Sequence, residues 1–176
     1  MHSDIENLLE ADHREIDELL RKLLAAFDAD DLEGVAFHLD LFWARLAMHI
    51  RAEHLHLFPA ILSSLSGDAG ITDSIAELRH DHDLFMRELA EAMKQLRKLS
   101  AGDGEATSLA GVRERVDRVR QRLADHNRKE EAEIYVFNPD AADALAAAIG
   151  RELDNLPPRF ASKEGYPGIN RRSDRG

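Results

Sequence analysis

The sequence predicts an all-α protein: an antiparallel up-down-up-down four-helix bundle with a short C-terminal fifth helix and a mobile tail. Four long segments repeat apolar residues at the 3.6-residue spacing that places them on one face of a helix. The connections between these segments are short and rich in turn-forming residues, as in antiparallel bundles. No strand-like alternation is long enough to indicate a sheet.

The first two predicted helices form the first half of the bundle. Ser3 and Glu6 make a capping box, which marks the start of the first helix. A turn is expected over residues 28–34, and Pro59 is expected to kink or shorten the second helix near its end. The apolar stripes of the two helices are Ile5, Leu9, Ile16, Leu20, Leu23 and Phe27, then Val35, Leu39, Phe42, Leu46 and Leu57.

The second half repeats this plan. After a connection over 63–72, the third helix is expected to be capped around Thr72 to Ser74, and a loop over 100–108 precedes the fourth. Asn138-Pro139 predicts the start of a short fifth helix that ends near residue 153. We therefore expect one bundle domain over 1–154 and a flexible tail over 155–176, which is polar and contains Gly and Pro.

Composition limits the function. The 176 residues suffice for about one domain, and the absence of cysteine excludes disulfides and thiolate ligands, so any metal must be bound by nitrogen and oxygen. A formal net charge of −11 argues against nucleic acid and anionic membranes as partners. The N-terminus does not have the pattern of a signal peptide, and we expect a cytoplasmic protein with no membrane partner.

Six titratable residues replace hydrophobes on the apolar stripes. Each half has a single histidine followed one helix later by a His-x3-Glu pair, a spacing that places both side chains on one helix face. In the predicted bundle all six fall at about one height, where burial without partners would cost several kcal/mol each. The six residues are His13, His49, Glu53, His82, His126 and Glu130.

This set predicts a metal centre. A single histidine on an apolar face is more often a hydrogen-bonded core residue than a ligand, but such a network needs neither the repeated spacing nor the common height. Four imidazoles and two carboxylates can form two coordination spheres with the glutamates placed to bridge them, which favours iron or manganese. Two iron ions are the cofactor that we expect.

The pattern resembles the hemerythrin-like, or HHE cation-binding, family over about residues 5 to 137. The resemblance implies a four-helix bundle with an oxo- or hydroxo-bridged di-iron centre, in which Glu53 and Glu130 bridge and the four histidines are terminal ligands. It also implies reactions with O2, peroxide or nitric oxide, or a role in iron supply.

The chain departs from the oxygen-carrying members of that family, which have two histidines a turn apart on the third helix. Here the residue one turn before His82 is Leu78, and His80 points to another side of the helix. A missing protein ligand leaves a position for water or an exogenous ligand and disfavours pure O2 carriage. Those carriers also use the carboxylate at the position of Glu131, which could replace Glu130 only through a π-bulge.

Neighbouring residues could support the ligands. Asp12 and Asp81 each precede a ligand histidine, where they could orient another ligand or be solvated. Asp17, one turn after His13, could hydrogen-bond a ligand. His56, at the edge of its stripe, is a weaker candidate for such support. We expect surface positions for His54 and His56 and packing roles for Trp43 and Tyr135.

Three functions follow. The first is a di-iron protein that binds or reduces a small oxidant: O2, H2O2 or NO. The second is a non-enzymatic iron or redox sensor that acts through a partner, with the tail as effector segment. The third is a bundle that holds zinc or no metal as a scaffold. The sequence does not decide whether the chain is an enzyme, and it leaves a homodimer open.

Overall fold

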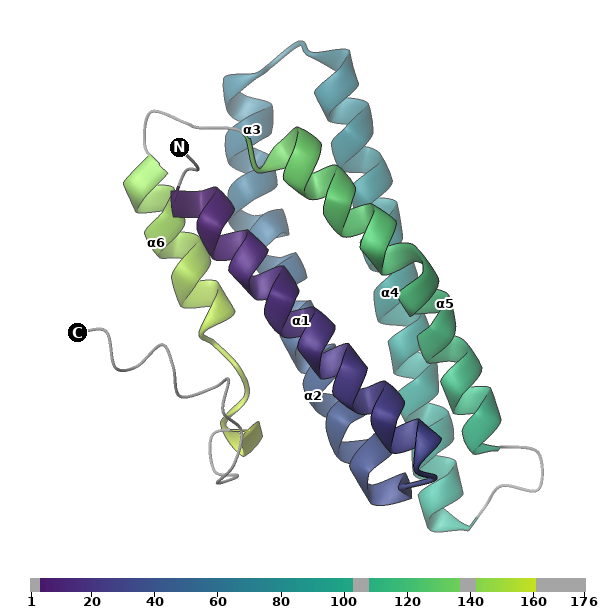
Figure 1. Ribbon diagram of the computed structural model, residues 1–176. Coiled ribbons are helices and arrows are strands. Elements are labelled where there is room, and N and C mark those ends of the chain that lie inside the picture. The colour runs from purple at the N-terminus through teal and green to yellow at the C-terminus, as the bar shows by residue number, and fades with distance from the viewer. Residues whose placement is uncertain (1–3, 103–107, 137–141, 161–176) are drawn as a thin grey trace.

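The protein is an all-helical bundle among the residues that the computed structural model describes, which are 4–102, 108–136 and 142–160. Its four long helices follow one another in alternating direction (Figure 1). A short helix, α3, continues the path of α2, and α6 packs on the outer side of α1 and α2. The α-helices are α1 Asp4–Asp28, α2 Leu32–Ala52, α3 Phe58–Ser64, α4 Ala69–Ala101, α5 Leu109–Lys129 and α6 Ala142–Leu153. The predicted fold class is confirmed.

Aspartate and serine side chains fix the helix starts. Asp31 accepts a hydrogen bond from the Gly34 backbone N–H, so α2 begins at Leu32, inside the turn expected over 28–34. Asp68 caps α4 in the same way, and the predicted cap around Thr72 to Ser74 is wrong by about one turn. The sequence offers Asp68, Thr72 and Ser74 as competing caps, and the first of them starts the helix.

Both α2 and α5 end in a π-helical turn. These turns span Glu53–Leu57 and Glu130–Ile134, and they close with backbone hydrogen bonds from Phe58 to Glu53 and from Tyr135 to Glu130. A π turn contains one residue more than an α turn, so each closing aromatic residue comes back above its glutamate. The helical path then continues through Pro59 to Ser64 and does not end at the proline.

The core consists of two apolar layers. The first layer lies toward the α1–α2 and α4–α5 connections and includes Leu23, Phe42, Leu89 and Val116. The second lies toward the N-terminus and α6 and includes Leu9, Phe58, Leu78 and Ile149. Along every long helix the residues that separate the two layers are the predicted histidines and glutamates. The polar level is therefore enclosed on both sides by apolar side chains.

The C-terminal part packs on the bundle as far as it is described. Phe160, in a 3₁₀ turn over Pro158–Phe160, is 3% exposed and belongs to the first apolar layer. Arg159 donates hydrogen bonds to both Asp40 carboxylate oxygens at 3.0 Å. Residues 161–176 of the predicted tail, like 140–141 of the predicted fifth helix, lie outside the described residues. Within the described part, every helix is too short or too polar to cross a lipid bilayer.

Candidate metal centre

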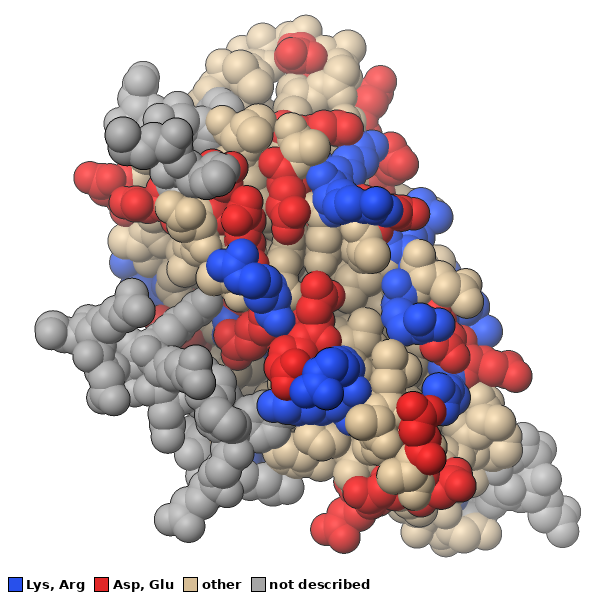
Figure 2. All heavy atoms as spheres, viewed as in Figure 1, with Lys and Arg blue, Asp and Glu red and all other residues tan. Residues whose placement is uncertain are grey.

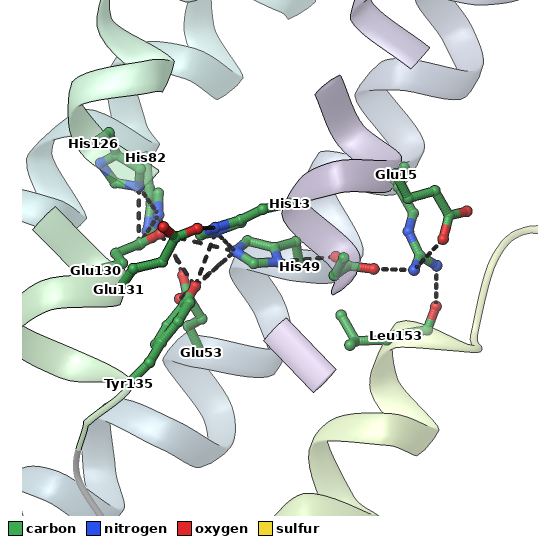
Figure 3. Close-up of polar contacts among 12 residues, drawn as sticks. His13, Glu15, His49, Glu53, His82, His126, Glu130, Glu131, Tyr135 and Leu153 are labelled. Carbon is green, nitrogen blue, oxygen red and sulfur yellow. Dashed lines mark hydrogen bonds and ion pairs between the residues drawn. The ribbon is translucent and has the colours of Figure 1, made fainter. Parts of the chain in front are cut away.

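The structure brings all six predicted residues together at the polar level between the apolar layers. α1, α2, α4 and α5 each contribute one histidine, and the glutamates stand at the first position of the two π turns (Figure 3). None of the six is more than 4% exposed; they are His13, His49, Glu53, His82, His126 and Glu130.

The histidines form two pairs. The Nε2 atoms of His13 and His49 lie 3.3 Å apart, and those of His82 and His126 lie 2.9 Å apart. We call the space beside His13 and His49 the first position. The space beside His82 and His126 is the second position. Each pair forms, with Glu130, a buried group of three side chains whose ligand atoms lie within 4.8 Å of one another.

Both glutamates span the two pairs. Glu130 Oε2 lies 3.2 Å from His13 Nε2, and its Oε1 lies 2.9 Å from His126 Nε2. Glu53 Oε1 lies 3.6 Å from His49 Nε2, and its Oε2 lies 3.4 Å from His82 Nε2. Each carboxylate thus offers one oxygen to each position, which is the arrangement that a bridging ligand needs.

Each histidine also has a partner at its other ring nitrogen, Nδ1. Asp12 Oδ2 lies 2.9 Å from His49 Nδ1, and Asp81 Oδ2 lies 3.3 Å from His126 Nδ1. An acceptor at Nδ1 fixes the tautomer that keeps the proton there and leaves the Nε2 lone pair free for a metal. Of the two roles considered for the aspartates, the structure therefore shows contact with histidines.

The aspartates are in turn held by arginines at equivalent places in the two halves. Arg45, four residues before His49, pairs with Asp12, and Arg122, four residues before His126, pairs with Asp81 at 2.5 Å. Arg45 is almost fully buried and also donates a hydrogen bond to the Leu153 carbonyl at 2.7 Å, whereas the Arg122 side chain is 48% exposed. The repeat seen in the sequence therefore extends to these supporting residues.

His13 and His82 have unlike partners. Glu131 Oε1 lies 2.8 Å from His13 Nδ1, and His54 Nε2 lies 2.9 Å from His82 Nδ1. Each partner directly follows one of the spanning glutamates. The expected surface position of His54 is wrong, because the π turn brings its ring to 5.1 Å from that of His82. Glu131 faces the outer nitrogen of a histidine, while Glu130 occupies the space between the pairs.

Tyr135 packs in the second apolar layer, as predicted, but its hydroxyl also reaches the centre, which the sequence did not predict. Its side chain is fully buried, and its hydroxyl donates to Glu53 Oε1 at 2.7 Å and lies 3.2 Å from Glu130 Oε2. The same oxygen is 3.0 Å from His13 Nε2 and 3.3 Å from His49 Nε2. The sequence does hold a signal for this contact, which is an aromatic residue five positions after each glutamate, Phe58 or Tyr135. Five residues make one π turn, so the spacing places the aromatic residue above the glutamate only if the turn is π-helical.

The charges of the buried groups are strongly coupled. Burial raises the pKa of Glu53 well above its usual range, and repulsion by Glu130 raises it further. Burial alone would also raise the pKa of Glu130, but contacts with His126, His13 and His82 hold it well below its usual range. Without a cation, therefore, Glu53 is the more readily protonated of the two spanning carboxylates. A cation between them would relieve the repulsion that raises the pKa of Glu53.

The histidines respond differently to their surroundings. Burial lowers the pKa of His82 from 6.5 to about 4, and burial lowers that of His49 despite its contact with Asp12. Burial would also lower the pKa of His13, but the nearby Glu130 and Glu131 carboxylates raise it above the ordinary value. His49 and His82 are thus kept neutral, the form in which imidazole binds a metal.

The donor set fits metal ions. Adjacent ligands of a six-coordinate ion with bonds of about 2.1 Å lie about 3 Å apart. The separations between the Nε2 atoms and the carboxylate oxygens, 2.9 to 4.0 Å, bracket that value. Glu53 Oε2 and Glu130 Oε1 are buried without a hydrogen-bond donor, which is costly unless a cation compensates them. The residues at hand are therefore suited to two ions bridged by two carboxylates.

The other residues considered in the sequence lie farther from the ligand atoms or contact the centre only at its edge. Leu78 is fully buried in the second apolar layer and His80 is exposed, so neither adds a ligand on α4. His56 faces α6, with its Nε2 3.9 Å from Glu152. Asp17 lies in a surface pocket of about 560 Å³ beside His13 and Glu131. Trp43 packs against the first apolar layer, as predicted.

A helical bundle with two pairs of buried histidines and two carboxylates that span them has the features of a cation-binding bundle. The profile of the Hemerythrin HHE cation binding domain family matches residues 4–137, and the chain belongs to this family. Comparison with curated proteins and with solved structures gave no match. The family and the His/Glu cluster together indicate metal binding.

Proposed function

We propose that this chain is a non-haem di-iron protein that binds or reduces a small oxidant: O2, H2O2 or NO. One observation carries the proposal: four Nε2 atoms in two pairs face the same two buried carboxylates, each of which points one oxygen toward each pair. His13 and His49 would hold one iron, His82 and His126 the other, and Glu53 and Glu130 would bridge. Iron in both positions would supply the one-electron redox steps that small oxidants require.

The surrounding residues define what such a site can do. The two apolar layers bury the six inner side chains, none of which is more than 4% exposed, and this burial strengthens the electrostatic interactions among them. Tyr135 holds a proton on its hydroxyl at 2.7 Å from Glu53, in a place where burial and the two carboxylates raise its pKa well above the usual range. The raised pKa keeps the hydroxyl protonated, so Tyr135 could donate a hydrogen bond to a small molecule bound beside the first position.

The number of protein ligands favours a reaction with the bound small molecule over its reversible binding. Leu78 fills the place one turn before His82 with an apolar side chain, so α4 supplies one imidazole to the centre. Coordination left free by the protein can be taken by water or by an exogenous ligand. We therefore favour reactivity with peroxide or nitric oxide over reversible O2 binding alone.

The first test is metal content and the visible spectrum after anaerobic reconstitution with Fe(II), followed by exposure to O2 and, separately, to H2O2. We expect about two irons per chain, new charge-transfer absorption and catalytic loss of peroxide. The matched controls are E130Q, which removes the shared carboxylate, and E133Q, which changes an exposed glutamate that bonds to Ser74. Negligible iron, or tight zinc alone, would refute the di-iron proposal.

A sensor is the second candidate function, and one chain of contacts favours it. The Leu153 carbonyl at the end of α6 accepts from Arg45, which pairs with Asp12, which contacts His49 (Figure 3). A metal ion on His49 would therefore stabilise the contact that holds α6. Hydrogen exchange in α6 should slow on metal binding if the protein is a sensor, and unchanged exchange would argue against it.

The charge of the chain bears on its partners. Asp and Glu side chains alternate with Lys and Arg over the face seen in Figure 2, so no large basic patch gathers there. Many of these charges pair along one helix, as Arg21 does with Glu18. With a net charge of −11, we propose that the protein has no nucleic-acid or membrane partner. We also propose a cytoplasmic location, as expected from the sequence.

A further inference from the structure

The two halves of the centre differ at one pair of equivalent residues. Glu131 follows Glu130 and contacts His13 Nδ1 at 2.8 Å, while His54 follows Glu53 and contacts His82 Nδ1 at 2.9 Å. A carboxylate at Nδ1 makes an imidazole a stronger electron donor to a metal on Nε2, because it stabilises positive charge on the ring. An imidazole partner such as His54 carries no negative charge, so it stabilises positive charge on the ring more weakly.

The nearby charges add to this difference. At the first position both histidines contact a carboxylate, Asp12 for His49 and Glu131 for His13. At the second position only His126 does, through Asp81. Asp81 pairs with Arg122 as Asp12 pairs with Arg45, so these arginines do not distinguish the two positions. On that side the Arg79 guanidinium lies 5.7 Å from the ring centre of Phe58, and burial together with this charge lowers the pKa of His54, the partner of His82.

The residue that closes each π turn differs as well. The Tyr135 hydroxyl lies within 3.3 Å of both Nε2 atoms at the first position and adds an oxygen there. Its counterpart Phe58 stacks on the His82 ring at 6.1 Å and offers no polar atom. A cation at the first position therefore meets more negative charge and one more oxygen than a cation at the second.

We propose that the two positions fill in a fixed order: the first position, at His13 and His49, binds its ion before and more tightly than the second, and Glu131 and His54 set this order. The inference rests on the proposed two-ion site and concerns a property that the site's ligands alone do not determine. The ligands are nearly the same in both halves, so the difference must come from the residues behind them.

The expected change in metal affinity follows from the general effect of residues that hydrogen-bond a metal-bound histidine. Changing a partner that orients a metal-bound histidine lowers metal affinity by about 10- to 100-fold. Glu131→Gln keeps the shape of the side chain and removes its charge, so the tight step should weaken by about tenfold or more. His54→Glu places a carboxylate behind His82 and should tighten the weak step. Glu133→Gln, two residues from Glu131 and exposed, is the matched control and should change neither step.

The experiment is an anaerobic titration of metal-free protein with Co(II), followed by calorimetry and by the visible absorption of bound cobalt. We expect two steps of one ion each in the wild type. Removing a ligand from each half assigns the steps: His126→Ala should keep the tight step and lose the weak one, and His49→Ala should do the opposite. Diffraction from wild-type crystals given one equivalent of Co(II) should place the anomalous signal at His13 and His49, which needs no variant to fold.

Three outcomes would overturn the inference: one step of two equal ions, the first cobalt at His82 and His126, or equal effects of Glu131→Gln and Glu133→Gln. Each of these leaves two bound ions and therefore leaves the proposed function intact. Folded wild-type protein that binds neither Co(II) nor Fe(II) would instead refute the proposed function and this inference with it.

Discussion

Arg45 and Arg122 occupy equivalent places in the two halves, and we predict very different costs when each is replaced by methionine. The Arg45 side chain is 3% exposed, and its partner Asp12 is fully buried. Removing one member of a buried ion pair leaves an uncompensated charge and costs about 3–5 kcal/mol. Arg122 is 48% exposed, so water can replace it beside Asp81, and the cost should be about 1 kcal/mol or less.

The assay is urea unfolding of the metal-free protein, followed by far-ultraviolet circular dichroism. R45M should lower the free energy of unfolding several-fold more than R122M does, with similar slopes of free energy against urea. The double variant D12N/R45M is the internal control. Because the cost arises from the unpaired Asp12 carboxylate, D12N should restore much of the stability that R45M removes. Equal costs for R45M and R122M, or no rescue by D12N, would refute the reasoning.

Three further predictions follow. Y135F should keep two irons per chain but slow peroxide loss by about 100-fold or more, since it removes the hydrogen-bond donor beside Glu53; metal analysis and initial rates separate the two effects. In the metal-free protein the pKa of His82 falls from 6.5 to about 4 on folding, so unfolding takes up a proton at acid pH. His82 should therefore lower stability by about 3 kcal/mol as the pH falls from about 7 to about 4. His13 acts in the opposite sense: because its pKa is raised on folding, it stabilises the folded state below pH 6.5, and this stabilisation is lost as the pH rises. The contribution of His82 is therefore isolated by comparing the wild type with H82Q in urea unfolding at each pH. Leu89→Ala should cost about 2–5 kcal/mol in the same assay, because Leu89 is fully buried in the first apolar layer.

The fold and the six inner residues could be predicted because one signal, helical periodicity, carries both. A histidine or glutamate at a stripe position must face the core, whatever the helix ends do. The helix starts were harder to predict. Asp68, Thr72 and Ser74 are all good caps by residue type, which does not rank them, and in the structure it is Asp68 that accepts from the Ile71 backbone N–H.

The residues behind the ligands could not be predicted from an α-helical period. On an ideal α-helix Glu131 points about 100° away from Glu130, and Tyr135 lies well off the line of the inner stripe. The π turn adds a residue to that part of the helix, so that Glu131 contacts His13 and Tyr135 reaches Glu53. Glu131 was considered in the sequence only through such a turn, and it stands behind a histidine instead of between the pairs.

The matching π turns also bear on how the chain arose. Glu53 and Glu130 begin turns of the same length at the same place in each half. A two-helix unit that was duplicated after gaining its extra residue would pass the turn to both copies, whereas separate insertions would have to strike the same site twice. The residues that now differ, His54 against Glu131 and Phe58 against Tyr135, would then record divergence after duplication. In that history the shared ligands are ancestral, and the inequality of the two halves is the later acquisition.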